Sequence, residues 1–172
     1  MYEIKSKKRC LDMTRQEKAK TLFLEGYNCS QAVLGAFCDV IEIDFETAMK
    51  LASSFGGGVA RMRHICGTCS AMFMVAGVVR GNSVPSAQLK SEHYSFIQDM
   101  AKSFADRNGS IICREILALR AQKSSVVDNS DHPLANERTE EYYRTRPCLA
   151  VVEDAVGFTC EWLGIDEIYP DV

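Results

Sequence analysis

The sequence predicts an all-α protein, a compact single-domain bundle of about six helices. Apolar residues recur at helical spacing through most of the chain, whereas strand-like alternation is limited to one weak candidate at residues 125–128. The chain has 172 residues, of which 47% are hydrophobic and 25% are charged. This length and composition are typical of one soluble domain with a hydrophobic core. They exclude disordered chains, collagen-like repeats and membrane bundles.

Capping residues and glycines mark the first three predicted helices. The first helix, with apolar residues from position 19 onward, ends at the break around Gly26. Asn28 is a suitable N-cap for the second, which runs through Ile41. Asp44 caps the third, and the three glycines at 56–58 stop it.

The second half of the chain carries similar signals. Glycine and asparagine end its helices, and serine or proline precedes their first turns. The predicted helices cover residues 66–79, 86–108, 110–119 and 146–163, with a surface loop at 121–135. The expected domain organisation is a charged leader at 1–13, a helical domain at 14–165 and a short tail at 166–172.

Charge and hydropathy indicate a cytoplasmic protein. The net charge is −3, so no strong attraction to nucleic acid is expected. The longest apolar run, Ala71–Val79, is well short of the roughly 20 residues of a membrane span, so no membrane insertion is expected. The charged residues 1–9 are followed by no apolar stretch, which argues against a secretory signal.

The 8 cysteines are the most informative feature of the composition. They are more frequent than usual and less frequent than in a short disulfide scaffold. In a reducing cytosol, clustered cysteines are typical of metal binding or redox chemistry. Half of them lie at predicted helix starts, where unpaired N–H groups and the helix dipole favour a thiolate. These four are Cys29, Cys66, Cys113 and Cys148.

The remaining cysteines differ in their expected roles. Cys69 forms a Cys-x-x-Cys motif with Cys66, which suits either a dithiol with a resolving cysteine or a pair of iron or zinc ligands. The βαβ context of thioredoxins and the second Cys-x-x-Cys of a zinc ribbon are both missing from the sequence. Helical-wheel positions make Cys38 and Cys160 packing residues, and Cys10 is peripheral in the leader.

The glycine-rich segment before Cys66 is a second candidate feature. Gly57, Gly58 and His64, together with Arg61 and Arg63, could cradle an anion or cofactor. The alternative is a tight turn that brings this loop close to the cysteines. His64 could also favour the Cys66 thiolate or act as a ligand, or it could simply face solvent.

One apolar block has two interpretations. Residues 72–75 are apolar and lie within the fourth predicted helix. Core packing explains them, and a homodimer face is the alternative.

The cysteine pattern resembles the redox-active protein family named for its C–GCAxxG–C–C motif. Two departures are visible: Thr68 stands where the motif has alanine, and Ala71 stands where it has its second glycine. The leader before Thr14 and the tail after Leu163 lie outside the resemblance. The matching segments are 26–33, 55–58, Cys66-Gly67, 113–117, Pro147-Cys148 and 152–155.

The resemblance implies an all-helical fold in which Cys29, Cys66, Cys113 and Cys148 are the functional set. Relatives of this fold occur in split-Soret cytochromes, for which an iron–sulfur cluster is described. Covalent haem is not expected, because the sequence has no Cys-x-x-Cys-His.

Three functions stay open at this point. The first is thiol–disulfide or electron-transfer chemistry with a redox partner of unspecified kind, with Cys69 as an additional thiol. The second is a module in which the four thiolates bind an iron–sulfur cluster or zinc. The third is a helical interaction protein whose cysteines are structural.

Overall fold

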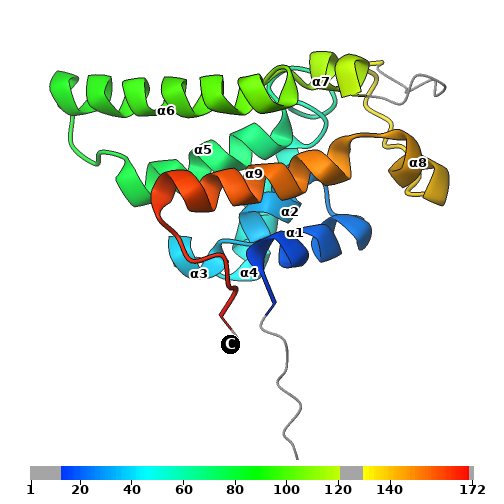
Figure 1. Cartoon of the computed structure of the whole chain (residues 1–172), viewed down its shortest axis with the longest axis horizontal. Helices are drawn as coiled ribbons and strands as arrows, with labels where there is room; N and C mark the ends of the chain where they lie inside the picture. Colours follow the sequence, from blue (N-terminus) through cyan, green and yellow to red (C-terminus); the bar gives the residue numbers. More distant parts are fainter. Residues whose placement is uncertain (1–12, 121–129, 171–172) are drawn as a thin grey trace, which may run out of the picture.

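The computed structural model describes residues 13–120 and 130–170, and it confirms the all-α class. These residues form nine α-helices and one 3-10 turn, with no strand beyond two isolated bridges. Figure 1 labels the helices in chain order. They are α1 (Arg15–Leu24), α2 (Cys29–Gly35), α3 (Cys38–Ile41), α4 (Phe45–Ala52), η1 (Ser53–Phe55), α5 (Gly67–Arg80), α6 (Ala87–Asn108), α7 (Cys113–Arg120), α8 (Glu140–Thr145) and α9 (Cys148–Leu163).

Helix α1 begins before the first apolar residue that predicted it. Thr14 accepts a hydrogen bond from the Glu17 backbone, and the Glu17 side chain accepts one from the Thr14 backbone. This reciprocal capping box satisfies two N–H groups at the helix start. The Thr-x-x-Glu spacing is visible in the sequence and is the signal for the earlier start.

The second predicted helix is divided into α2 and α3. The backbone of Phe37 leaves the helical region, and Ala36 and Phe37 instead donate to carbonyls three residues back. The Phe37 ring becomes fully buried as a result. Core packing therefore overrides the continuous helical pattern at this point. The short helix α8 was also not predicted, because its sequence has no apolar stripe.

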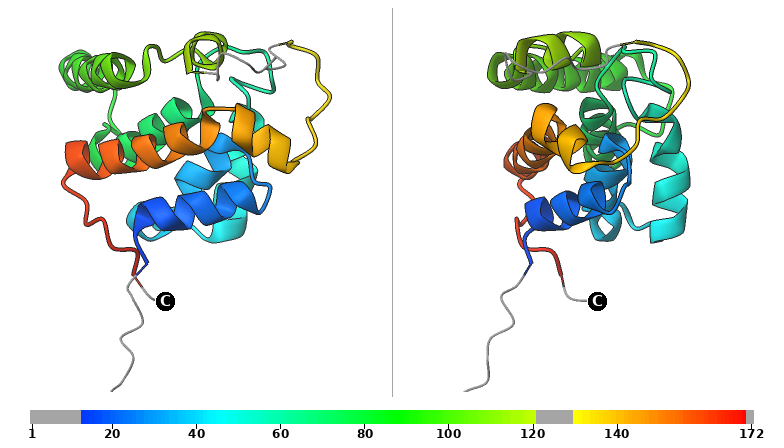
Figure 2. Two further views of the ribbon diagram at one scale, coloured as in Figure 1. Left: turned by 45° about the vertical axis from the view of Figure 1, so that its right-hand side comes forward. Right: turned by 90° about the vertical axis from the view of Figure 1, so that its right-hand side faces the viewer.

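The helices are stacked in three levels, which Figures 1 and 2 show from different sides. Helices α5 and α9 lie in the middle, α6 and α7 lie on one side of them, and α1 to α4 lie on the other. Helix α9 packs against α1, α2, α5 and α6. The largest fully buried side chains include Phe23, Phe37, Phe104, Met72 and Met100. The apolar block at 72–75 contributes two fully buried residues, as core packing predicts.

The segment after α9 returns to the start of α1. Tyr169 donates its backbone N–H to Met13, and Arg15 donates its own to Glu167. The buried Arg15 guanidinium forms two hydrogen bonds with the Asp39 carboxylate, at 2.6 and 2.7 Å. These contacts tie both ends of the described chain to α3.

Some expectations fall on residues outside the described ranges. Cys10 and the weak strand candidate at 125–128 are among them. Within the described ranges, no helix is long and apolar enough to cross a membrane.

Candidate functional site

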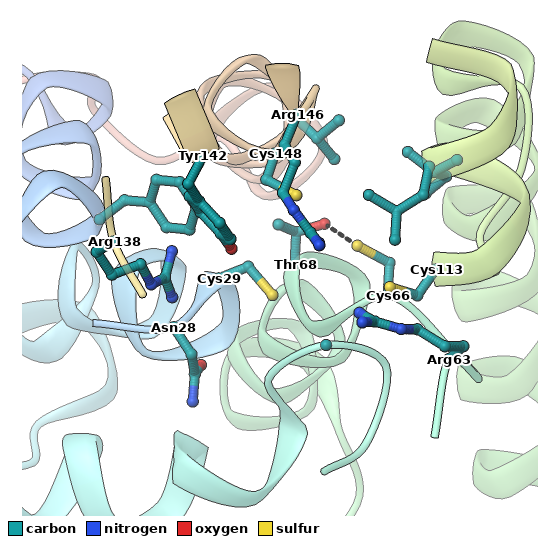
Figure 3. A pocket seen from close by; sticks show the side chains of 15 residues that line it. Asn28, Cys29, Arg63, Cys66, Thr68, Cys113, Arg138, Tyr142, Arg146 and Cys148 are labelled. Carbon is teal, nitrogen blue, oxygen red and sulfur yellow. Dashed lines mark hydrogen bonds between the residues drawn. The ribbon is translucent and has the colours of Figure 1, made fainter. Parts of the chain in front are cut away.

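Four cysteines from four helix starts line one cavity. Cys29, Cys113 and Cys148 are the first residues of α2, α7 and α9, and Cys66 is the N-cap of α5. All four line the same cavity, which we call the inner cavity. Figure 3 shows their sulfur atoms facing a common space. The structure therefore brings together the four cysteines that the sequence singled out, and all four are free thiols.

The position of Cys29 is fixed by two helix starts. The Asn28 side chain accepts hydrogen bonds from the N–H groups of Ser30 and Gln31, which caps α2. The Cys29 sulfur then packs against Gly67 at the start of α5. A Cβ atom at position 67 would lie 2.7 Å from that sulfur and 2.6 Å from the Phe55 oxygen. Only glycine at this position leaves room for the sulfur.

The loop before Cys66 has an unusual backbone. Five consecutive residues from Gly57 to Arg61 have positive φ angles, and so does Arg63. The left-handed region disfavours side chains, above all a branched one such as Val59. Strain of this kind persists where the surroundings impose it, often at functional sites. Here it places the Gly57 N–H toward Cys29 and buries Arg63 beside Cys113.

An isolated bridge joins the starts of α5 and α7. Ile65 pairs with Ile112, so that Cys66 donates its N–H to Ile111 and Cys113 donates its own to His64. Gly58 lies against Cys113, since a Cβ atom there would lie 2.6 Å from that of Cys113. The glycine loop therefore forms a tight turn that approaches Cys113.

Cys29 and Cys66 both line the inner cavity, and their interaction shifts their pKa values in opposite directions. The Cys66 thiol lowers the pKa of Cys29, as do the N–H of Gly57 and the charge of Arg138. Together they outweigh burial and bring this pKa to about 6. The same contact with Cys29, together with burial, raises the pKa of Cys66 well above its ordinary value. The two shifts favour loss of the proton from Cys29 before Cys66.

The other two cavity thiols stay protonated. Burial and the negative charge of Cys29 raise the pKa of Cys113, against the opposing charge of Arg63. Burial also raises the pKa of Cys148 to about 12. A helix start alone therefore does not produce a thiolate in this protein.

Three arginines and a tyrosine complete the cavity wall. Arg63, Arg138, Tyr142 and Arg146 all line it, and no acidic side chain of the described residues does. The Arg138 and Arg146 guanidinium groups lie 4.6 and 4.8 Å from the centre of the Tyr142 ring. Arg138, Tyr142 and Arg146 were not predicted, because nothing in their local sequence connects them with the cysteines.

The remaining candidates lie away from the cavity. Cys69 is fully buried in the core, and burial raises its pKa. Cys38 and Cys160 also belong to the core, in agreement with their predicted packing role. His64 is exposed and does not line the cavity.

Thr68 contacts the thiol pair directly. Its Oγ1 lies 3.2 Å from the Cys66 sulfur, in hydrogen-bond contact. The departure from the family motif at this position thus gives Cys66 a hydroxyl partner.

A metal site requires several donor groups that lie close together. A single zinc ion holds its thiolates about 2.3 Å away, so its ligands must lie close together. Within residues 13–120 and 130–170, no three His, Cys, Asp or Glu residues are grouped closely enough to hold a metal ion. The thiols as they lie do not fit a zinc site.

Comparison with known proteins identifies the family of the chain. Residues 27–162 match the family described as "Putative redox-active protein (C_GCAxxG_C_C)". The match spans most of the chain and includes all four cavity cysteines. No curated protein and no solved structure is significantly similar to the sequence. The chain belongs to the C_GCAxxG_C_C redox-active family.

Proposed function

We propose that this family member is a thiol–disulfide redox protein in which Cys29 is the nucleophile and Cys66 is the resolving thiol. The observation that carries the proposal is that the free cysteines Cys29 and Cys66, from the starts of α2 and α5, line the same cavity. A thiolate is the reactive form of cysteine, and Cys29 alone among the four combines partial exposure with a lowered pKa.

The reaction is an exchange of two electrons between the thiol pair and a substrate disulfide. The Cys29 thiolate attacks one substrate sulfur, the substrate S–S bond breaks, and the first substrate thiolate leaves. Cys66 then gives its proton to solvent and attacks the Cys29 sulfur of the mixed disulfide. The second substrate thiolate leaves, and the protein retains a Cys29–Cys66 disulfide. A dithiol reductant would restore the pair by the reverse exchange.

The pKa of Cys66 explains the order of these steps. Cys29 raises the pKa of Cys66 in two ways, through a hydrogen bond and through its negative charge, and both depend on the Cys29 thiolate. Formation of the mixed disulfide removes that charge. The Cys66 thiol therefore becomes easier to deprotonate only after Cys29 has reacted, which favours the resolving step over premature reaction of Cys66.

The test is controlled oxidation with a small neutral disulfide, hydroxyethyl disulfide, followed by mass mapping of unreduced peptides. We expect a Cys29–Cys66 disulfide in the natural sequence. In Cys66→Ser, Cys29 should stop as a mixed disulfide, and in Cys29→Ser neither product should form. Cys160→Ser is the matched control and should behave as the unchanged protein. Oxidation that joins another pair, or leaves Cys29 unmodified, would refute the assignment.

A second candidate uses Cys29, Cys66, Cys113 and Cys148 as ligands of an iron–sulfur cluster. The observation in its favour is that four thiols from four helix starts line one cavity, and four thiolates are the usual ligand set of such clusters. Because no three of these thiols are grouped closely enough to hold a metal ion as they lie, this candidate requires them to move together. Anaerobic purification with iron and acid-labile sulfide analysis separates the two candidates. Stoichiometric iron and sulfide that disappear when any one of the four is replaced would support the cluster and overturn the dithiol.

A further inference from the structure

A second cavity adjoins the inner one on the side of the glycine loop. Its wall includes Arg61 and Asn136, and its rim includes the exposed Ala60 and Pro133. We call it the outer cavity. It shares six lining residues with the inner cavity, which are Asn28, Gly57, Arg63, Arg138, Tyr142 and Arg146.

The two cavities differ in size. The inner cavity has a volume of about 50 Å³ and the outer one about 310 Å³. One water molecule needs about 10–15 Å³, so the inner cavity admits only a few atoms. The outer cavity reaches the range of roughly 300–1,000 Å³ that is typical of small-molecule sites. A substrate that presents a sulfur to Cys29 must therefore place most of its atoms in the outer cavity.

Four arginine side chains line the outer cavity, which are Arg61, Arg63, Arg138 and Arg146. Arg61 donates to the Asn136 oxygen at 2.6 Å, which holds the guanidinium at the wall. Guanidinium groups bind carboxylates and phosphates through paired hydrogen bonds.

Arg138 connects this charge with the reacting sulfur. Its guanidinium lies over the rings of Phe23 and Tyr142, at 4.9 and 4.6 Å from their centres. Its Nη1 is buried and has no hydrogen-bond partner in the described part of the chain. A buried guanidinium N–H without an acceptor is costly, and a bound anion would supply that acceptor.

We propose that the substrate of Cys29 is a small disulfide that carries an acidic group, and that the outer cavity binds that group through its arginines. This inference rests on the proposed thiol–disulfide function and names its substrate class. The acidic group binds at the outer wall while the sulfur reaches Cys29 in the inner cavity. The electron balance is that of the exchange described above, with two thiols of the acidic compound as products.

The experiment compares two chromogenic aromatic disulfides that differ in charge. One is 5,5′-dithiobis(2-nitrobenzoate), with two carboxylates, and the other is the uncharged 4,4′-dithiodipyridine. Rate constants for Cys29 are divided by those of a free small thiol with the same reagent. We expect a preference of about tenfold or more for the anionic disulfide, which salt should reduce.

Two variants, each of which removes one positive charge, show whether the outer cavity causes the preference for the anionic disulfide. Of the two cavities Arg61 lines only the outer one, so Arg61→Gln should reduce the preference for the anionic disulfide by about two- to fivefold, the effect of one partly exposed ion pair. Arg80 lies at the far end of α5, about 20 Å along the helix, and Arg80→Gln should leave both rates unchanged.

The possible results test the proposed substrate class and the proposed thiol–disulfide function separately. A Cys29 that reacts with both disulfides but shows no preference for the anionic one overturns the substrate class and leaves the thiol–disulfide function standing. Equal effects of Arg61→Gln and Arg80→Gln also overturn it. A Cys29 that reacts with neither reagent overturns the proposed function, and this inference with it.

Discussion

The pH dependence of Cys29 alkylation is the most direct consequence of the thiol pair. The pKa of Cys29 is lowered to about 6, first by the hydrogen bond from Cys66 and then by the Gly57 N–H and the Arg138 charge. Because the thiolate is the reactive species, the alkylation rate should rise through a midpoint near pH 6 and stay level above pH 7. An ordinary cysteine has its midpoint near pH 8.5 and would still be gaining rate there.

The pH midpoint of alkylation is a better measure of the Cys29 pKa than the alkylation rate at pH 7. At pH 7 a pKa of about 6 leaves roughly 90% of Cys29 as thiolate, against about 3% for an ordinary thiol. Nucleophilicity falls with pKa, however, with a Brønsted coefficient of about 0.4–0.5, which removes roughly a factor of 10 to 18. The net advantage at pH 7 is therefore only about two- to threefold.

Replacing Cys66 tests the cause of the low pKa. A hydrogen bond to a charged group contributes about 1.5–3 kcal/mol, and one pKa unit corresponds to about 1.36 kcal/mol. The variant Cys66→Ala should therefore raise the midpoint of Cys29 by about 1 to 2 pH units. Cys160→Ala removes a cysteine from the core outside the cavity and should leave the midpoint unchanged.

The assay is brief alkylation with limiting iodoacetamide from pH 4.5 to 9, with the Cys29 peptide quantified by mass spectrometry. A midpoint near pH 8.5 in the natural sequence would refute the assigned thiolate. A midpoint near pH 6 that does not move in Cys66→Ala would refute the hydrogen bond as its cause.

Three further predictions concern stability. Gly67→Ala should lower the free energy of unfolding by about 1–3 kcal/mol, because its Cβ would overlap the thiol and carbonyl packed there. Gly77→Ala, on the same helix with open space around it, should instead raise it by about 0.5–1 kcal/mol, and thermal denaturation of both variants is the measurement. Asp39→Ala leaves the buried Arg15 without its carboxylate and should cost about 3 kcal/mol in urea unfolding, and a loss below 1 kcal/mol would contradict the role of this ion pair. Cys69→Ala should lower the melting temperature slightly and leave the Cys29 pH profile unchanged, whereas a shifted profile would place Cys69 in the redox site.

The helix starts were predictable because they are local properties of the chain. Asn28 caps α2 with hydrogen bonds to residues two and three positions away, and Ser86 caps α6 in a similar way. Such signals can be read without knowledge of the fold. The Asn28 cap placed Cys29 at a helix start, and Pro147 placed Cys148 at another. The cavity follows from the way these starts converge.

The rest of the site depends on contacts between distant segments. Arg138 reaches the cavity from a stretch with no apolar periodicity, and its ring partner Phe23 lies on α1. Arg63 is buried through a left-handed loop conformation that its residue type disfavours. The Cys-x-x-Cys spacing suggested that Cys69 would share the site, but one turn further along α5 the side chain lies in the core. Tertiary packing decides each of these outcomes.

The contrast between Cys29 and Cys148 shows what distinguishes the reactive thiol. Each is the first residue of a helix, each is partly exposed and each lines the inner cavity. Their pKa values nevertheless move in opposite directions, to about 6 and about 12. The helix start is common to both, so it cannot cause the difference. The pKa of Cys29 is lowered by the Cys66 thiol at the start of α5 and by the Gly57 N–H of the glycine loop. Neither group lowers the pKa of Cys148. Packing of three separate segments around one sulfur, rather than the cysteine pattern alone, therefore distinguishes Cys29, the nucleophile we propose, from Cys148.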